Sequence, residues 1–327
     1  MTALERGWYQ KQGWCYLLAP FSLLFWLLSA ARRILFRVKL KASYRLPVPV
    51  VVVGNITVGG TGKTPFTLWF CQFLRDQGFT PGIISRGYGV KLKQPLLVSA
   101  KHSAAEVGDE PLLLAERSGC PVVVSPNRVA AARHLLQQCP QVDLIISDDG
   151  LQHYALQRDL EIVLIDGQRG LGNGWLLPAG PLRELPSRLK HVDLVIANSG
   201  QHPLADGSMA IQALRVVPLI PTETALAAGA AVDLIAGIGN PQRFERSVLT
   251  AGYQIKRRRF LADHHAFSPL DFTGLTPPLL MTEKDAVKCR RFAQPGWYYL
   301  AVQAQPEPAL ITTLTEKLIL IRSHYGY

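Results

Sequence analysis

Short β-branched runs alternate with helical patterns from Pro47 onward, and this alternation predicts an α/β protein with a mostly parallel sheet and flanking helices. Two further features complete the outline: an apolar N-terminal segment, and a change of composition followed by a new strand-like run. We therefore expect an N-terminal membrane-associated helix in residues 1–42, a main domain in residues 43–230, and a second, smaller α/β domain in residues 231–327.

The elements of the predicted sheet follow from these runs. The predicted strands are Val50–Val53, Gly82–Ser85, Val122–Ser125, Leu144–Ser147, Ile162–Ile165 and Leu194–Ala197, with a later strand at Val232–Ala236. The predicted helices include Pro65–Arg75, Pro111–Arg117 and Val129–Gln137. The composition changes over Pro218–Ala231, which places the domain boundary near Ala230. Ligands in such sheets bind beyond the carboxyl ends of the strands, so the residues that follow each strand are the first candidates for a site.

The composition excludes several classes of protein. With 18% charged and 48% hydrophobic residues, the chain is neither disordered nor a coiled coil. Its 327 residues are consistent with about two domains. A net charge of +11 favours anionic partners but selects none of them. The five cysteines are scattered and form no CxxC pair, which argues against a disulfide framework and favours a reducing compartment.

The segment from Trp14 to Ala31 is almost wholly apolar and contains no charged residue. As a helix it would be about 27 Å long, close to the about 30 Å of a bilayer's hydrocarbon core. If the segment spans, the positive charges from Arg32 to Lys41 place the rest of the chain in the cytoplasm. Pro20 and the cations on both sides fit a helix embedded in one leaflet equally well. A buried core helix is the alternative to any membrane contact.

A glycine-rich loop follows the first predicted strand and precedes a helix. Its backbone N–H groups and the helix N-terminus can bind phosphate oxygens, Lys63 can reach the β- and γ-phosphates, and the Thr64 hydroxyl can ligate Mg²⁺. This order predicts a P-loop NTPase-type sheet that binds ATP. Thr57 stands where the strict pattern has glycine, and a glycine-rich turn with an incidental lysine is the alternative. The residues expected to contact the nucleotide are Val58, Gly59, Gly60, Thr61, Gly62, Lys63, Thr64 and Pro65.

Two adjacent carboxylates, Asp148 and Asp149, end the apolar strand Leu144–Ser147. In a P-loop sheet an aspartate at this position holds Mg²⁺ directly or through water. Adjacent side chains of an extended chain point in opposite directions, so we expect one of the two to face the metal. A simple Asp-Asp-Gly turn is the alternative.

Further acids and histidines are candidates for proton transfer. Asp109 lies in Val107–Pro111, directly before a predicted helix, where an acid can also serve as a plain N-cap. His264 lies between Asp263 and His265, and it is either a proton acceptor or a structural histidine. A zinc site is disfavoured because no third ligand has a usable spacing.

Several polar residues could bind an anionic substrate. Arg86 and Tyr88 follow a predicted strand, and Arg183 and Glu184 end a loop rich in glycine and proline. The basic stretches Lys256–Arg259 and Arg290–Arg291 are expected to be solvated faces, with acidic lipid as the alternative partner. These stretches lack interleaved aromatic residues, which argues against nucleic acid as a partner.

Taken together, these motifs resemble the tetraacyldisaccharide 4′-kinase family, the lipid A 4′-kinases of Gram-negative bacteria. They span nearly the whole chain in the family's order, which makes the resemblance far more specific than a P-loop alone. The matching segments, beside the apolar N-terminal helix, are Val53–Pro65, Ser85–Gly89, Val107–Pro111, Asp148–His153, Leu176–Glu184, Asp263–His265 and Met281–Lys288.

The resemblance implies transfer of the γ-phosphate of ATP to the 4′-hydroxyl of an acylated glucosamine disaccharide 1-phosphate, with Mg²⁺ as cofactor. It implies a catalytic role for Lys63 and a proton-accepting pair formed by Asp109 and His264. It assigns Asp148 and Asp149 to Mg²⁺ and its water network. It places the enzyme on the anionic cytoplasmic face of the inner membrane and leaves the oligomeric state open. The rival functions are a membrane-anchored ATPase and a nucleotide-dependent binding module without a lipid acceptor.

Overall fold

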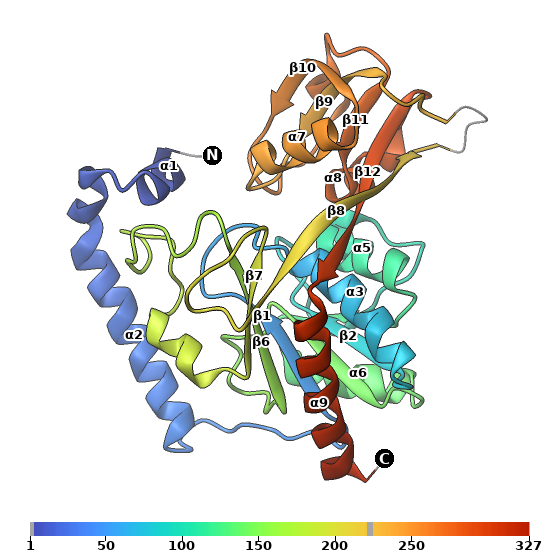
Figure 1. The fold of residues 1–327 in the computed structure, drawn as a ribbon. Helices are drawn as coiled ribbons and strands as arrows, with labels where there is room; N and C mark the ends of the chain where they lie inside the picture. Colours follow the sequence, from blue (N-terminus) through green and yellow to red (C-terminus); the bar gives the residue numbers. More distant parts are fainter. Residues whose placement is uncertain (1–2, 221–224, 327) are drawn as a thin grey trace.

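A single mixed sheet forms the centre of the molecule, which is described by a computed structural model over residues 3–220 and 225–326 (Figure 1). Within these residues the sheet has twelve strands in the order β10-β9-β11-β12-β8-β7-β6-β1-β5-β2-β4-β3. Neighbouring strands run parallel except in the pairs β8–β12 and β3–β4. The predicted class, a mostly parallel sheet with flanking helices and one apolar N-terminal helix, is therefore confirmed.

The predicted strands and helices are all present, and most are longer by one or two residues. The strands are β1 (Val50–Gly54), β2 (Pro81–Ser85), β3 (Leu96–Leu97), β4 (Val122–Val124), β5 (Leu144–Asp148), β6 (Leu160–Asp166), β7 (Leu194–Asn198), β8 (Gly207–Pro218), β9 (Ala231–Ala236), β10 (Gln254–Phe260), β11 (Leu279–Thr282) and β12 (Trp297–Pro306). The α-helices are α1 (Ala3–Tyr9), α2 (Ala19–Arg37), α3 (Lys63–Asp76), α4 (Ala104–Val107), α5 (Asp109–Ser118), α6 (Arg128–Gln138), α7 (Pro241–Thr250), α8 (Glu283–Cys289) and α9 (Pro308–Tyr325). Short 3₁₀ helices lie at Gly13–Leu18 (η1), Pro186–His191 (η2), Pro269–Phe272 (η3) and Arg290–Phe292 (η4).

The two faces of the sheet pack against different helices because side chains alternate along each strand. In β1, Val51 and Val53 join the core beneath α3, α5 and α9, whereas Val50 and Val52 join the core on the α6 side. Both faces of this strand are buried, which explains its unbroken run of valines. The sheet therefore fixes the carboxyl ends of β1 and β5 side by side.

The second half of the chain extends the same sheet. Strands β9 to β12, with α7 and α8, enclose two smaller apolar cores of their own. The long antiparallel pair β8–β12 connects these strands to the first half, and α9 returns to pack on the core beneath α3 (Figure 1). The predicted boundary near Ala230 stays a prediction, and the composition change that suggested it includes residues 221–224, which lie outside the described residues.

The N-terminal apolar segment lies along the surface instead of in the core. Among the described residues, the stretch Gly13–Arg37 is long and apolar enough to cross a membrane by length and composition, and only 11% of its most apolar window is buried. The Ser22 hydroxyl attaches α2 to the body by donating to the Leu176 carbonyl (2.8 Å) and accepting from the Ala179 N–H (3.0 Å). The alternative of a buried core helix is therefore wrong for this segment.

The packing of α9 gives a test of the fold. Leu314 is fully buried beneath this helix, whereas Leu320 on the same helix is 70% exposed. We expect Leu314→Ala to lower the free energy of unfolding by about 2–5 kcal/mol, because it removes buried methyl groups and leaves a cavity. Leu320→Ala is the matched control and should change it by less than about 0.5 kcal/mol. Denaturant titration followed by circular dichroism measures both variants, and equal effects would contradict the packing described.

Candidate active site

The glycine-rich loop joins β1 to α3 and depends on one glycine in particular. Gly62 has a φ of +92°, and a Cβ at this position would lie 2.3 Å from Nδ2 of Asn198. The same Nδ2 donates a hydrogen bond to the Thr61 carbonyl (2.9 Å). Asn198, at the end of β7, therefore supports the loop from below, and no larger residue fits in place of Gly62.

The loop segment that ends at Glu184 packs directly on the phosphate loop. Thr57 forms an isolated antiparallel bridge with Leu182, and the Val58 N–H donates to the Pro181 carbonyl (2.8 Å). The Arg183 N–H donates to the Ile56 carbonyl (2.7 Å). Thr57 is thus extended and paired with another segment, which explains why glycine is not required at this position.

Lys63 and Arg183 converge on one carboxylate. The Lys63 Nζ lies 3.5 Å from Oδ1 of Asp149, and Nη1 of Arg183 lies 3.0 Å from both Asp149 oxygens. Burial would raise the pKa of Asp149, but the charges of Lys63 and Arg183 lower it well below its usual range. Asp149 has a φ of +46°, so it has left the extended strand. The expectation that Asp148 and Asp149 point in opposite directions assumed an extended backbone at both residues.

Asp148 is buried at the end of β5 and accepts a hydrogen bond from the Ser85 hydroxyl (3.2 Å). Burial, together with the charges of Glu110 and Asp149, raises the pKa of Asp148 to about 7. A cluster of oxygen donors with a surplus of negative charge is the chemistry that Mg²⁺ prefers. Thr64, Asp148 and Asp149 therefore fit the predicted metal site by donor type. The described residues contain no group of three or more His, Cys, Asp or Glu side chains arranged to hold a metal.

Asp109 and His264 are in contact, as expected of a proton-accepting pair. Oδ2 of Asp109, at the start of α5, lies 3.2 Å from Nδ1 of His264. His264 has a φ of +58°, and its ring lies 4.8 Å from the ring of Tyr88, centroid to centroid. The loop after β10 therefore brings the histidine over the first half of the sheet.

Two lysines of α8 surround this pair, and no role for either follows from the sequence motifs described above. Lys284 Nζ lies 3.4 Å from Nε2 of His264 and 3.0 Å from Oε1 of Glu110, and Lys288 Nζ lies 3.4 Å from Oδ2 of Asp109. Burial would raise the pKa of Asp109, but the hydrogen bond from His264 and the two ammonium groups lower it well below its usual range. Asp109 is therefore held as a carboxylate. The two lysines are four residues apart, which places both on one face of the helix. This spacing is the sequence pattern from which a pair of neighbouring ammonium groups could have been predicted.

A cavity of about 450 Å³ brings most of the predicted site residues together. It is lined by the whole segment from Val58 to Pro65 and by Tyr88, Asp149, Arg183 and His264. The second half of the chain contributes further polar residues, namely Asn240, Arg243, Asp263 and Lys284.

Asp109 and Asp148 are not among the residues that line this cavity, and neither are two of the predicted substrate residues. Arg86 is exposed at the end of β2. Glu184 turns away from Arg183, and its carboxylate accepts hydrogen bonds from Gln152 (2.8 Å) and Tyr154 (2.8 Å). Their roles in substrate binding stay predictions.

Both basic stretches form ion pairs, and in the second one Arg290 donates to Glu116 (2.5 Å). On β10, Arg257 and Arg259 donate to backbone carbonyls of the same lobe, and Arg258 pairs with Glu245 (2.5 Å). Arg291 is 70% exposed and lies 4.0 Å from Glu106. The β10 arginines therefore form several contacts with residues in the second half of the chain.

The sheet, the glycine-rich loop after β1 and the carboxylates at the end of β5 define a P-loop nucleotide-binding protein with a site for phosphoryl transfer. The sequence model of the family described as "Tetraacyldisaccharide-1-P 4'-kinase" matches residues 14–319. The chain belongs to this family.

Individual relatives agree with this assignment. The chain is 48% identical to the tetraacyldisaccharide 4′-kinase of Idiomarina loihiensis, over 96% of this chain and 97% of that protein. It is 50% identical to the one of Aeromonas salmonicida, over 96% of each. A crystal structure of LpxK from Aquifex aeolicus in complex with ATP superimposes with a TM-score of 0.77 at 28% identity, covering 93% of this chain and 99% of that one.

The lysine pair on α8 gives a test of the site's electrostatics. Removing one ammonium group in Lys288→Met should raise the pKa of Asp109, so that the carboxylate takes up a proton at a higher pH than in the parent protein. We expect the acidic limb of the pH profile for phosphate transfer from ATP to move upward by about one pH unit.

Lys288→Arg keeps the charge and should leave that limb in place, and Arg291→Gln is a control for removing a positive charge from an exposed site. Thermal unfolding checks that each variant is folded. An unchanged acidic limb in folded Lys288→Met would show that this lysine does not set the charge state of Asp109.

Proposed function

We propose that this chain transfers the γ-phosphate of ATP to the 4′-hydroxyl of a tetraacylated glucosamine disaccharide 1-phosphate, giving lipid IVA in lipid A biosynthesis. The family assignment supports the reaction, and the ATP complex of the Aquifex aeolicus relative supports the phosphate donor. The single observation in this structure that carries the proposal is the Asp109–His264 contact beside the phosphate loop. An ATPase or a nucleotide-dependent binding module does not account for the family assignment.

The residues that line the cavity, and Asp109 in contact with one of them, suit this reaction. Backbone N–H groups from Gly59 to Thr64 bind the phosphates, and Lys63 offsets the charge that develops on the transferred group. Asp109 is a carboxylate positioned to accept a hydrogen bond from the attacking hydroxyl and to direct it at phosphorus. His264 orients that carboxylate and can share the incoming proton, while Lys284 lies against its other ring nitrogen.

Mg²⁺ belongs to the same proposal. The Thr64 hydroxyl and the carboxylates of Asp148 and Asp149 are the residues that would hold it. When bound, the ion neutralises charge on the phosphate oxygens of ATP. The raised pKa of Asp148 supports this assignment, because a nearby dication would favour its ionised form.

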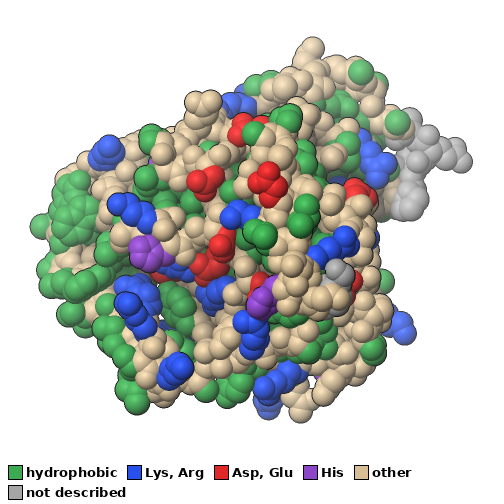
Figure 2. Space-filling model, turned by 60° about the horizontal axis from the view of Figure 1, so that its bottom comes forward, with side chains coloured by type: hydrophobic (Ala, Val, Ile, Leu, Met, Phe, Trp, Pro, Cys, Tyr) green, Lys and Arg blue, Asp and Glu red, His purple; other side chains and the backbone are tan. Residues whose placement is uncertain are grey.

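Membrane association is the third part of the proposal. The exposed apolar side chains of α2 gather along one edge of the molecule in Figure 2, next to a hollow bordered by Lys, Arg and His side chains. Removing acyl chains from a bilayer costs about 0.8 kcal/mol for each CH₂ group. An enzyme seated on the cytoplasmic face of the inner membrane through α2 reaches the sugar headgroup without that cost.

The division into three parts is also a proposal. Residues 1–42 form the membrane-associated helix, 43–230 the kinase domain and 231–327 the smaller domain. The separate apolar cores of the second half support this division, while α9 returns from the smaller domain to pack on the first core.

Phosphate transfer is tested with γ-labelled ATP, Mg²⁺ and the disaccharide lipid in detergent, by following label into lipid. We expect Asp109→Asn to reduce the rate about a hundredfold or more while ATP affinity is nearly unchanged, because the carboxylate acts on the acceptor hydroxyl. Lys63→Ala should lower both the rate and ATP affinity.

Glu316→Gln, an exposed acid on α9, is the matched control and should behave as the parent protein. Label that appears only as inorganic phosphate would favour an ATPase, and ATP binding without turnover would favour a binding module. Transfer at the parent rate in Asp109→Asn would contradict the role given to Asp109.

The membrane anchor is tested by placing charge on the exposed face of α2. Leu24 and Leu28 are 53% and 63% exposed and lie one helical turn apart. The double variant Leu24→Asp/Leu28→Asp should weaken association with phospholipid vesicles about tenfold or more, because two leucines lose their burial in the bilayer. Vesicle sedimentation measures the bound fraction.

Ile319→Asp/Leu320→Asp on α9 is the matched control, because these side chains are equally exposed and lie away from α2. Equal loss in both variants would mean that α2 is not the specific anchor. No loss in either would overturn membrane association through this helix.

A further inference from the structure

The turn that follows β6 joins the two halves of the chain, and Asp166 is the residue that joins them most directly. Oδ2 of Asp166 accepts a hydrogen bond from Nη2 of Arg243, which belongs to α7 in the second half. Oδ1 of the same carboxylate accepts the N–H groups of Gln168 (3.0 Å) and Arg169 (3.0 Å), so Asp166 also shapes its own turn. Only 4% of Asp166 is exposed, and solvent and salt therefore screen this ion pair weakly.

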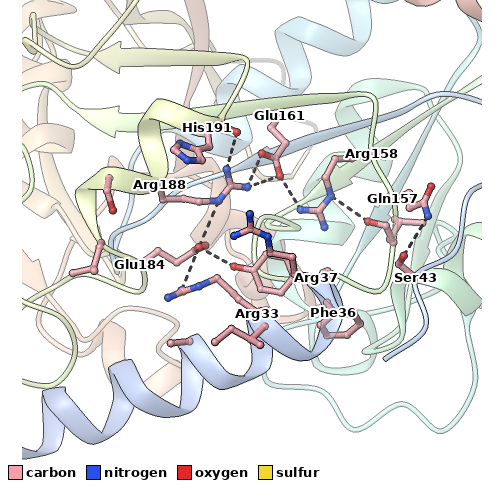
Figure 3. A pocket seen from close by; sticks show the side chains of 16 residues that line it. Arg33, Phe36, Arg37, Ser43, Gln157, Arg158, Glu161, Glu184, Arg188 and His191 are labelled. Atoms are coloured by element: carbon pink, nitrogen blue, oxygen red, sulfur yellow. Dashed lines mark hydrogen bonds and ion pairs between the residues drawn. The ribbon is translucent and has the colours of Figure 1, made fainter. Parts of the chain in front are cut away.

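This pair differs from the ion pairs in the pocket between α2 and η2, which Figure 3 shows. There Glu161 binds Arg158 (2.8 Å) and Arg188 (2.5 Å), and all three residues belong to the first half of the chain. Asp166 lies on the same strand as Glu161, but its arginine comes from the second half. The pair of Asp166, unlike those of Glu161, therefore fixes the second half relative to the first.

Two neighbours of Asp166 also bind the second half. Oε1 of Gln168 accepts a hydrogen bond from Nη2 of Arg246 on α7 (2.7 Å). Nη2 of Arg169 donates to the Gly239 carbonyl (3.1 Å), in the loop that leads into α7. Three residues of one turn thus bind α7 and the loop before it.

The same turn is bonded to the residue that supports the phosphate loop from below. Asp166 lies opposite Asn198 in the pairing of β6 with β7, and the Gly167 N–H donates to the Asn198 carbonyl (2.8 Å). The side chain of Asn198 in turn donates to the Thr61 carbonyl (2.9 Å). The position of the turn is therefore fixed relative to the phosphate loop within the first half.

The loop before α7 lies against the phosphate loop from the second half. A Cβ on Gly239 would lie 3.5 Å from the backbone nitrogen of Gly60 and 3.2 Å from Oδ2 of Asp263. Asp263 directly precedes His264, the partner of Asp109. The contacts of Gly239 therefore relate the phosphate loop to the segment that carries the histidine.

We propose that Asp166 is a positioning residue for phosphoryl transfer. By binding Arg243, it holds the loop before α7 against the phosphate loop and keeps the second half where His264 reaches Asp109. Asp166 does not line the cavity, so it acts through Arg243 and not on ATP or the lipid. The proposal rests on the proposed function, because the step that it concerns is the attack of a hydroxyl directed by Asp109.

Arg243 itself lines the cavity, so a direct contact between Arg243 and ATP is the competing explanation. The two explanations predict different kinetics. Loss of an arginine that binds ATP equally before and during the reaction raises the KM for ATP, whereas loss of a contact that aligns the reacting groups lowers kcat. Replacing Asp166 separates the two, because Arg243 stays present and charged.

The first test is Asp166→Asn, which keeps the size of the side chain and an oxygen for the turn but removes the charge that binds Arg243. Transfer of label from γ-labelled ATP to the disaccharide lipid is measured in detergent. We expect kcat to fall about tenfold or more, because small displacements of reacting groups slow such a step strongly. The KM values for ATP and for the lipid should each change less than about threefold.

A double-mutant cycle tests whether the two residues act as a pair. Arg243→Met should lower kcat by a factor similar to that of Asp166→Asn. The double variant Asp166→Asn/Arg243→Met should be no slower than the slower single variant, because either change already removes the contact. Arg243→Lys keeps the charge without the planar fork and should restore part of kcat.

Glu245→Gln is the matched control. Glu245 lies on the same helix, α7, and pairs with Arg258 (2.5 Å), so this variant removes an ion pair that lies wholly within the second half. It should leave kcat and both KM values unchanged. Thermal unfolding of every variant shows whether a lower kcat reflects less folded protein.

Three results would overturn the proposal. One is an unchanged kcat in folded Asp166→Asn, and another is a raised KM for ATP at unchanged kcat in Arg243→Met, which would assign Arg243 to nucleotide binding. The third is an additive loss in the double variant or an equal loss in Glu245→Gln. If the parent protein transfers no label to the lipid, the proposed function fails and the proposal fails with it. A parent protein that transfers label, beside an Asp166→Asn variant with the same kcat, contradicts the positioning role alone.

Discussion

The contact between Asp109 and His264 joins residues 155 positions apart in the sequence, and the geometry of the site depends on it. Asp109 is fixed at the start of α5 on the first half of the sheet. His264 lies on the loop after β10, at the opposite end of the strand order. The long antiparallel pair β8–β12 makes this contact possible, because it continues the sheet from the strands that carry the phosphate loop to those that carry the histidine.

Positively charged side chains lie beside two carboxylates of the site and keep both of them ionised. Lys284 and Lys288 offset the charge of Asp109, so a carboxylate with little exposure remains ionised. Lys63 and Arg183 do the same for Asp149. At Asp148, burial and the charges of Glu110 and Asp149 outweigh the charges of Lys63 and Arg128, so its pKa rises. The surplus of negative charge is therefore concentrated where a metal ion would supply the missing cation.

The sequence predicted the parts of the site that depend on local order. The phosphate loop, the acids after β5 and the order of strands and helices were all predictable, because glycine placement, valine runs and strand-end carboxylates have local causes. The resemblance to a family added the Asp109–His264 pair, which no spacing could supply. The site roles themselves stay predictions, even where the structure brings the residues together.

The remaining features depend on tertiary contacts that the sequence does not encode locally. The positions of Lys284 and Lys288 beside Asp109 follow from the pairing of β11 with β9 and β12, which is set by the whole sheet. The opposite directions of Arg183 and Glu184 follow from the bridge that pairs Leu182 with Thr57. A local sequence pattern places both side chains at the end of one loop, but it does not show that they point in opposite directions.

That bridge also connects the surface helix to the phosphate loop. Ser22 of α2 bonds to the backbone at Leu176 and Ala179, and the same segment continues through Leu182 to its pairing with Thr57. Hydrogen bonds at both ends of this segment therefore link α2 to the wall of the cavity at the phosphate loop. Under the proposed function, this link relates the position of a lipid at α2 to the phosphate loop, and transfer of one phosphoryl group to one hydroxyl requires such positioning.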